Sequence, residues 1–417
     1  MRQWMVAAKK ADFYAIAEKF HVDPVVARII RNREVIGEKN IRIYLGGNLS
    51  DLSDPHQMKD MDRLVEILAQ KIRKQVHIRI IGDYDVDGVT SSHLFLTALR
   101  RVGAKVDVVI PHRIQDGYGL SLHLLQQAKE DGVDTILTCD NGIAAIDEIA
   151  WAKAQKMTVL VTDHHAVPFE EHEGRRTEKK SLADAVVNPH QQDCRYPYKE
   201  LCGAGVAWNV IRVLYENYDM DKREAEDLLD FVAMATVCDV MSLTGENRIL
   251  VKEGLKRIRH TKNIGLQALM QACNVQPENI SAYHFGYVLG PCVNATGRLD
   301  TARHALRLFE TGQETEAEEI ARDLVDLNQE RKELTLQGVE MAKKLCEEGG
   351  YENDPVLVLF LPDVHESIAG LIAGRIREMY NRPVFVLTRG EEGVKGSGRS
   401  TENYSMYENM CGCAELF

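Results

Sequence analysis

Short apolar runs rich in β-branched residues recur in the first half of the chain, and helical patterns separate them. Such runs predict strands, and those without polar alternation are typical of parallel strands buried on both faces. The alternation of strands and helices over residues 76–190 predicts right-handed crossovers and a parallel sheet. The predicted strands are Val76–Ile81, Lys105–Ile110, Thr135–Cys139, Thr158–Thr162 and Ala185–Val187.

A second, smaller region with the same alternation lies near the C-terminus. Residues 314–347, which precede it, form one long helical pattern without proline. At about 1.5 Å per residue, such a helix would span roughly 50 Å and could connect two lobes. The elements predicted beyond it are the strands Pro355–Leu361, Pro383–Thr388 and Val394–Ser400 and the helix Ser367–Met379.

The other segments complete a four-part organisation. Apolar residues at helical spacing predict helices over Ala11–Phe20, Pro24–Arg33 and Asp60–Lys74, with a loop at 46–55, and residues 201–310 are mostly helical in pattern. The charged stretch 170–180 is expected to be a surface loop. We therefore predict a helical lead-in (1–75), a main α/β domain (76–310), a connecting helix (311–350) and a second α/β domain (351–417).

Acidic and histidine residues follow three of the predicted strands directly. The clusters are Asp83-Tyr-Asp85-Val-Asp87-Gly, Asp140-Asn-Gly and Asp163-His164-His165, and a helix is expected to start near Val89. Ligands of open parallel sheets bind beyond the carboxyl ends of the strands, so these side chains should converge. Gathered carboxylates repel one another and need a cation. The pattern therefore predicts a metal site, with two divalent ions.

A fourth candidate ligand, Asp239, lies in the apolar run Phe231–Val240. A buried carboxylate without a partner is costly, so this one needs a cation or strong hydrogen bonds. Other interpretations of single motifs remain open. Asp140-Asn-Gly alone fits a simple turn, and Asp85-x-Asp87-Gly alone fits a calcium loop, although the rest of the EF-hand pattern is absent. Gly203-Ala-Gly205 indicates close helix packing more than a nucleotide turn.

Composition adds three constraints. The net charge of −12 weakly disfavours a uniformly basic nucleic-acid binder, but a local basic groove is compatible with an acidic total. The longest apolar runs have strand length, so no membrane span is expected, and the N-terminus does not resemble a signal peptide. Nine cysteines without a C-x-x-C pair favour reduced thiols and a cytoplasmic location.

Taken in order, the four acidic clusters resemble the motifs of the DHH phosphoesterase superfamily. The segments Arg113–Leu120, Gly290–Leu299 and Gly396–Ser400 are similar to the RecJ family of single-strand-specific exonucleases within it. The resemblance covers nearly the whole chain. It implies an α/β fold in which a parallel-sheet DHH domain is linked by a long helix to a smaller, incomplete DHH-associated domain.

The resemblance also implies a cofactor and site residues. The cofactor would be two divalent ions, Mn²⁺ or Mg²⁺, and an imidazole ligand favours Mn²⁺. Its implied ligands are Asp83, Asp85, Asp140, His164 and Asp239. Asp163 and His165 are implied to act as acid–base or supporting groups, and Asp87 to orient the loop. The implied phosphate contacts are Arg113, Arg298, Ser397 and Arg399, with His365 as a further substrate contact; structural salt bridges are the alternative for the arginines.

The family pattern continues past Gly396–Ser400 to a Gly-Gly-His motif and an OB-fold, which this sequence does not reach. We therefore expect a C-terminally truncated relative, with apolar surface exposed on the second domain and a weaker hold on a strand. The implied activity is hydrolysis of single-stranded DNA from the 5′ end, in repair and recombination, with single-strand-binding protein and a helicase as partners. The alternatives are short oligonucleotides, cyclic dinucleotides or pyrophosphate as substrate, or an inactive binding module.

Overall fold

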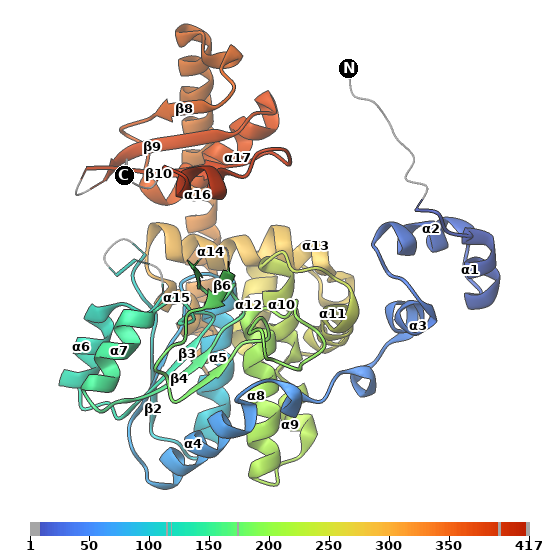
Figure 1. The fold of residues 1–417 in the computed structure, drawn as a ribbon, viewed down its shortest axis with the longest axis vertical. Helices are drawn as coiled ribbons and strands as arrows, with labels where there is room; N and C mark the ends of the chain where they lie inside the picture. Colours follow the sequence, from blue (N-terminus) through green and yellow to red (C-terminus); the bar gives the residue numbers. More distant parts are fainter. Residues whose placement is uncertain (1–8, 114–115, 118, 173–174, 391–392, 414–417) are drawn as a thin grey trace.

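The computed structural model describes residues 9–113, 116–117, 119–172, 175–390 and 393–413. Its larger lobe is built on a five-stranded parallel sheet in the order β2-β1-β3-β4-β7 (Figure 1). The predicted α/β fold with a central parallel sheet is confirmed. The strands are β1 (Ile78–Ile81), β2 (Val106–Val109), β3 (Thr135–Cys139), β4 (Thr158–Thr162) and β7 (Ala185–Val187).

The strand order places a switch point between β1 and β3. The chain moves from β1 outward to β2 and then returns to the other side of β1 as β3. The register pairs Ile81 with both Val109 and Thr138, so the carboxyl ends of these strands are level. Such a switch point leaves a crevice outside the strand ends, and the first two acidic clusters begin there.

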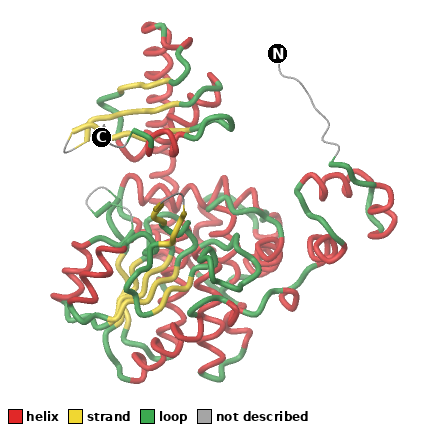
Figure 2. Tube along the Cα trace, in the orientation of Figure 1, coloured by secondary structure: helices red, strands yellow, loops and turns green. Residues whose placement is uncertain are grey.

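Helices cover both faces of this sheet, as Figure 2 shows with strands in yellow and helices in red. One face carries α4 (Met61–Arg73), α5 (Val86–Arg101) and α8 (Gly203–Asn217). The other carries α6 (Leu122–Glu130) and α7 (Ile146–Ala154). Since α5 lies between the sheet and other helices, it is buried on nearly all sides.

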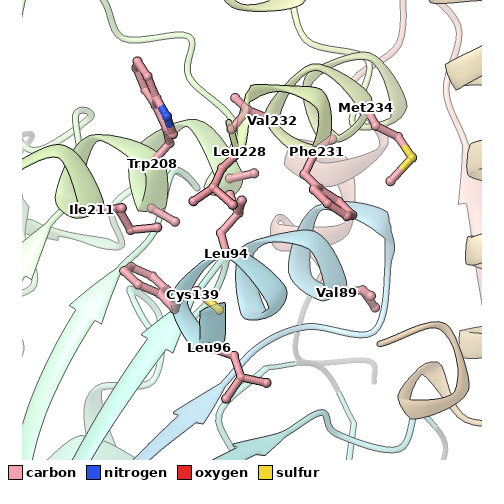
Figure 3. Packing of buried hydrophobic residues seen from close by; sticks show 14 of the residues in the cluster. Val89, Leu94, Leu96, Cys139, Trp208, Ile211, Leu228, Phe231, Val232 and Met234 are labelled. Atoms are coloured by element: carbon pink, nitrogen blue, oxygen red, sulfur yellow. The ribbon is translucent and has the colours of Figure 1, made fainter. Parts of the chain in front are cut away.

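The main core forms around α5. Leu94 and Phe95 of this helix are fully buried, and Figure 3 shows Leu94 between the sheet and Leu228, Phe231 and Val232. Further helices complete this lobe, which confirms the mostly helical pattern of residues 201–310. They are α9 (Lys222–Glu226), α10 (Leu229–Cys238), α11 (Gly245–Ile258), α12 (Ile264–Ala272), α13 (Ala282–His284), η4 (Phe285–Leu289, a π-helix), α14 (Gly290–Leu299) and α15 (Ala302–Glu310).

A 36-residue helix, α16 (Glu314–Gly349), runs from the larger lobe into a smaller one (Figure 1). The smaller lobe has the mixed sheet β10-β9-β8, with β8 and β9 parallel and β9 and β10 antiparallel. Val358 and Phe360 of β8 are 56% and 47% exposed. Its elements are β8 (Leu357–Phe360), η6 (Glu366–Ile368), α17 (Ala369–Tyr380), β9 (Val384–Gly390), β10 (Gly393–Arg399) and α18 (Met406–Cys411).

The N-terminal helices α1 (Phe13–Phe20), α2 (Pro24–Asn32) and α3 (Glu38–Gly46) form a small unit beside the larger lobe (Figure 1). Ile30, Ile41 and Tyr44 make its separate core. The sequence did not predict α3, and the loop expected at 46–55 contains the short turn η1 (Leu49–Asp51). Asn48 caps this turn by accepting from Ser50 N, a local contact that leaves no apolar pattern.

Two further predictions were wrong. The stretch 170–180 is not a loop, because β5 (Phe169–His172) and β6 (Arg175–Glu178) pair there as an antiparallel hairpin. Backbone hydrogen bonds join these two strands, and their charged sequence has no apolar alternation that would mark them. The helix expected from Val89 begins at Val86, which places Asp87 in the first turn of α5. Within the part of the chain described above, every helix is too short or too polar to cross a bilayer.

Candidate metal centre

The first acidic cluster occupies the tight turn between β1 and α5. Asp85 caps α5, since its Oδ1 accepts from Gly88 N at 3.0 Å. Asp83 is 1% exposed. A Cβ on Gly88 would lie 2.5 Å from the backbone of Asp83, so the turn needs glycine at this position. This packing directs the carboxylates of the cluster toward the end of the sheet.

The second cluster follows β3, with Asp140 in the left-handed region at φ +61°. The neighbouring Asn141 holds it there, because Asn141 Nδ2 donates to Ile81 O at 3.1 Å and to Cys139 O at 2.9 Å. These two bonds join the ends of β1 and β3, which brings the first two acidic clusters together. Sequence reasoning gave Asn141 no role; an amide directly after a ligand candidate was the available signal.

The third cluster follows β4 and is ordered by Asp163. The carboxylate of Asp163 accepts from Ile143 N at 2.9 Å, His164 N at 2.7 Å and His165 Nδ1 at 2.8 Å. Burial opposes its ionisation, yet these hydrogen bonds, first that of His165, lower its pKa. In return, the bond to Asp163 raises the pKa of His165 to about 9. His165 is therefore a cation held in one orientation at neutral pH.

Two helix ends complete the site. Asp239 is the C-terminal cap of α10, with 25% of its side chain exposed, and the neighbouring Val240 is 88% exposed at φ +58°. The expectation that this run stays buried through Val240 is wrong, because α10 ends at Cys238. On the opposite side, Asp87 accepts from Gly203 N at 2.5 Å and Ala204 N at 2.8 Å.

The amides of Gly203 and Ala204 belong to the N-terminal end of α8, where unpaired N–H groups favour an anion. Gly203 also approaches the second cluster, since a Cβ on it would lie 2.6 Å from Asp140 Cβ. The close packing expected of Gly203-Ala-Gly205 is confirmed, although its partner is the acidic cluster, which the sequence did not indicate.

The four clusters converge on one point. His164 Nε2 lies 3.0 Å from Asp140 Oδ1 and 3.6 Å from both Asp87 Oδ2 and Asp239 Oδ2. Ligand atoms of three sets of residues lie within 4.8 Å of one another. These sets are Asp83, Asp85 and Asp140; Asp87, His164 and Asp239; and Asp140, His164 and His165. The predicted convergence of the clusters is therefore confirmed.

Burial and mutual repulsion disfavour the charged forms of these carboxylates. Burial is the larger cause and the neighbouring carboxylates the next, and together they raise the pKa of Asp83 and of Asp239 to about 8. The same causes raise the pKa of Asp85 and hold that of Asp140 well above its ordinary value. The site thus gathers carboxyl groups whose charged forms need a bound cation to be stable.

The unpaired polar atoms of this cluster fit divalent metal ions. Asp83 Oδ1, Asp140 Oδ1 and His164 Nε2 are buried and have no hydrogen-bond partner among the described residues. Buried polar atoms are nearly always paired, so unpaired ones that face each other indicate an absent partner. Carboxylate oxygens suit Mg²⁺ and Mn²⁺, and the imidazole nitrogen favours Mn²⁺.

These pKa shifts predict how pH affects the stability of the metal-free protein. Asp83 and Asp239 titrate near 3.8 in the unfolded chain and near 8 in the fold, so stability falls as pH rises through this range. His165 contributes stability below its ordinary pKa of 6.5 and loses it as pH rises through 9. The metal-stripped protein should therefore melt at a lower temperature at pH 8.5 than at pH 6.

Mn²⁺ should reverse this trend, since its ligands must be deprotonated. The rise in melting temperature on adding saturating Mn²⁺ should be larger at pH 8.5 than at pH 6. Thermal unfolding of chelator-treated protein, with and without Mn²⁺, measures both effects. A metal-free melting temperature that rises with pH over this interval would contradict the assigned shifts.

A group of arginines lies where the two lobes meet. Arg298 of α14 donates to Ser367 O of η6 at 2.6 Å, which links the larger lobe to the smaller one. The guanidinium of Arg113 lies 4.7 Å from the centre of the Tyr84 ring, beside the first acidic cluster. Arg399 of β10 donates to Ser397 Oγ at 3.2 Å and to Gly398 O at 2.7 Å.

Burial and the positive charges of neighbouring arginines lower the pKa of Arg298 and Arg399. Burial first, and then Arg113, lowers the pKa of Arg298 to about 10. Burial, Arg377 and Arg113 lower the pKa of Arg399. Sequence reasoning missed Arg377 and Arg331, which add to the positive charge here; they lie within helices, where no motif marked them. Cations held close together in this way favour an anionic partner.

His365 and Ser397 occupy the adjoining part of the smaller lobe. His365 Nδ1 lies 2.6 Å from Ser367 Oγ and caps η6, so this ring nitrogen has a structural partner. Ser397 lies opposite Gly370, where a Cβ would approach Ser397 Oγ to 2.7 Å. All the residues predicted for substrate binding therefore lie in one region, close to the bond between Arg298 and Ser367.

Comparison with known proteins agrees with this arrangement. Residues 77–236 match the DHH family, N-terminal domain. The single-stranded-DNA-specific exonuclease RecJ of Haemophilus influenzae is 36% identical over 397 residues, which cover 92% of this chain and 67% of that protein. RecJ of Bacillus subtilis is 32% identical over 404 residues, 96% of this chain and 49% of that protein. The chain thus spans about half to two thirds of the length of these relatives.

Solved structures show the same fold. Exonuclease RecJ bound to manganese is 32% identical, with a TM-score of 0.73 over 85% of each chain. RecJ of Thermus thermophilus in complex with Mn²⁺ is 29% identical, with a TM-score of 0.79 over 97% of this chain and 56% of that one. Since the similarity in sequence and fold extends over most of its length, the chain belongs to the RecJ family of DHH-type proteins.

Proposed function

We propose that the chain is a metal-dependent exonuclease that hydrolyses single-stranded DNA from its 5′ end to mononucleotides, in repair and recombination. One juxtaposition carries the proposal: a cluster of converging carboxyl groups at the strand ends adjoins several arginines at the junction of the lobes. The first suits divalent cations, and the second suits the phosphates of a strand. The names of the relatives support DNA as the strand.

The five candidate ligands are Asp83, Asp85, Asp140, His164 and Asp239. Two Mn²⁺ or Mg²⁺ ions bound there would supply a nucleophile at neutral pH and stabilise the charge on the phosphate oxygens. Asp87 fixes the turn through the amides of α8. Asp163 keeps His165 protonated and oriented, so His165 Nε2 can donate to a phosphoryl or leaving-group oxygen.

The rest of the substrate would be held by the arginines. Arg113, Arg298 and Arg399 offer planar donors that match phosphate oxygens, and Ser397 adds a hydroxyl. Because Arg298 donates to Ser367 O across the lobes, a phosphate between Arg298 and Arg399 would contact both lobes at once. His365, the N-terminal cap of η6, would contact the substrate through Nε2, because its Nδ1 faces Ser367 Oγ.

The direct test is degradation of a 5′-labelled single strand beside the matched duplex, with Mn²⁺ and then with EDTA. We expect a 5′-labelled mononucleotide as the first product from the single strand with Mn²⁺, no product with EDTA, and an intact duplex. A 3′-labelled strand should release its label last. Equal degradation of the duplex, or no cleavage by folded, Mn²⁺-loaded protein, would reject the proposal.

The alternative substrates are separated in the same assay by adding a dinucleotide and a cyclic dinucleotide. Cleavage of these alone would mean that the metal centre is active but that the chain does not bind longer strands. Binding of a single strand without any cleavage would favour the inactive binding module. The filled set of ligand positions argues against that module.

Arg399→Ala should weaken the hold on the strand. Loss of a charged hydrogen bond costs about 1.5–3 kcal/mol, so KM for a single strand should rise about 10- to 100-fold. Cleavage of a dinucleotide should change much less. If Arg399 contacts a phosphate, the slope of log KM against log salt should also fall by about 0.7.

The matched control is Arg389→Ala, on the adjacent strand β9, where the arginine is exposed. It should leave KM and the salt slope nearly unchanged. Equal effects of the two substitutions would show that the smaller lobe contributes only general positive charge. A cytoplasmic location, and association with single-strand-binding protein and a helicase, stay predictions that fractionation and pull-down experiments would check.

A further inference from the structure

Two cysteines from different helices lie sulfur to sulfur in the larger lobe. Cys273 caps the C-terminal end of α12, and Cys292 lies in the first turn of α14. Their Sγ atoms are 3.8 Å apart, within the range of a thiol hydrogen bond. Cys292 is 2% exposed, whereas Cys273 is partly exposed. The pair takes no part in the metal centre or the arginine group.

The two cysteines line a cavity of about 270 Å³. Asn328 and Lys332 of α16 also line it. A peroxide molecule is far smaller than this space. Asn328 Nδ2 donates to Cys292 Sγ at 3.5 Å, so a fixed donor faces the more buried sulfur. The cavity therefore gives a small polar reagent access to the thiol pair.

The surroundings lower the pKa of Cys292, whose thiol also donates to Val288 O at 3.3 Å. The hydrogen bond from Cys273 is the main cause that lowers its pKa, and Asn328, Lys332 and Arg331 lower it further against the effect of burial. The hydrogen bond to Cys292, and then burial, raise the pKa of Cys273. A thiolate beside a second thiol is the arrangement found at cysteines that oxidise reversibly.

We propose that Cys273 and Cys292 form a site of reversible oxidation by hydroperoxides. Cys292 thiolate attacks one peroxide oxygen; the O–O bond breaks, and Cys292 sulfenic acid and hydroxide form. Cys273 then attacks the sulfenic sulfur, the S–O bond breaks, and a disulfide and water form. In total, two thiols lose two electrons and two protons, and hydrogen peroxide is reduced to two water molecules.

The closing movement is short, since the sulfurs must approach by about 1.8 Å to reach the disulfide bond length. The bond would tether α12 to α14. The latter helix also carries Arg298 and Asn294, whose Oδ1 accepts from Val86 N at 3.1 Å at the start of α5. The proposal does not depend on the proposed function, because its test detects the disulfide itself.

The test uses the full chain with Cys411→Ser and Cys413→Ser, which removes the nearby pair of C-terminal thiols. The protein is treated with hydrogen peroxide, quenched with catalase, denatured, alkylated and mapped by mass spectrometry. We expect a loss of about 2 Da in the intact mass before alkylation and, after it, one linked peptide pair containing Cys273 and Cys292; dithiothreitol should reverse both. The buried Cys139, whose Sγ faces Ser92 Oγ, should remain alkylatable and serves as an internal control.

Cys273→Ser is the matched variant, because it removes only the second thiol. Its Cys292 should then be trapped by dimedone as a sulfenic acid, and no linked peptide should form. The proposal is overturned if Cys273 and Cys292 alkylate as fully as Cys139 after peroxide treatment. It is also overturned if Cys292 passes to sulfinic acid in the parent protein without forming a bond to Cys273.

Discussion

Asp140→Asn should abolish hydrolysis and at the same time stabilise the metal-free protein. Asp140 belongs to two of the three sets of converging ligand atoms, and its Oδ1 has no hydrogen-bond partner among the described residues. An amide is a far weaker ligand than a carboxylate, so we expect the rate to fall at least roughly 10³-fold, or about 4 kcal/mol in the barrier. Without metal, the substitution removes one of several buried acids that repel each other.

The metal-free variant should therefore gain about 0.5–2 kcal/mol in its free energy of unfolding. Steady-state rates with Mn²⁺ and thermal unfolding in chelator measure the two effects. The matched control is Asp134→Asn. Asp134 lies just before β3, at the end opposite to Asp140, and pairs with Lys71. It should cost less than about 1 kcal/mol and leave the rate unchanged. Full activity of Asp140→Asn would remove this residue from the centre.

Gly203→Ala should displace groups of the same site, because Gly203 at the start of α8 packs against Asp140. The new Cβ would lie 2.6 Å from Asp140 Cβ and 2.9 Å from its Oδ1, closer than such contacts allow. Relief requires α8 or the β3 turn to move, and overpacking of this kind costs about 1–3 kcal/mol. A shift of α8 also moves the amides of Gly203 and Ala204 away from Asp87.

Misplacement of a catalytic group by about 1 Å can cost 10²-fold in rate, so we expect a loss of that size even in the fraction that stays folded. Gly374→Ala in α17 is the control, since no described heavy atom lies within 4 Å of a Cβ there. It should stabilise slightly, by about 0.5–1 kcal/mol, as expected for glycine to alanine within a helix. If Gly203→Ala is as active and stable as Gly374→Ala, the close approach of α8 to the site is wrong.

Much of the site could be predicted because its residues follow strands. A buried parallel strand has a clear apolar signature, and the carboxyl ends of neighbouring strands meet, so Asp83, Asp140 and His164 could be placed together. Asp239 was found for a different reason, since a charge beside an apolar run needs a partner. The long helix α16 was also clear, because an uninterrupted helical pattern needs no tertiary information.

What escaped prediction depends on packing between distant segments. Asn141 supports the site through bonds to two strand ends, and Gly203 through its distance to Asp140; neither role leaves a local pattern. Arg377 comes close to Arg399 only through the packing of α17 against β10 within the smaller lobe. The β5–β6 hairpin lies in a charged stretch of sequence without apolar alternation.

The placement of the metal ions is tested most directly by anomalous X-ray scattering at the manganese edge from crystals of this chain grown with Mn²⁺. Our account predicts anomalous peaks among the carboxylates of Asp83, Asp85, Asp140 and Asp239 and the imidazole of His164, and their loss on EDTA treatment. Strong peaks elsewhere with none at this cluster would contradict it. The proposed ligands would then be a structural acidic network, and the hydrolysis would need another centre.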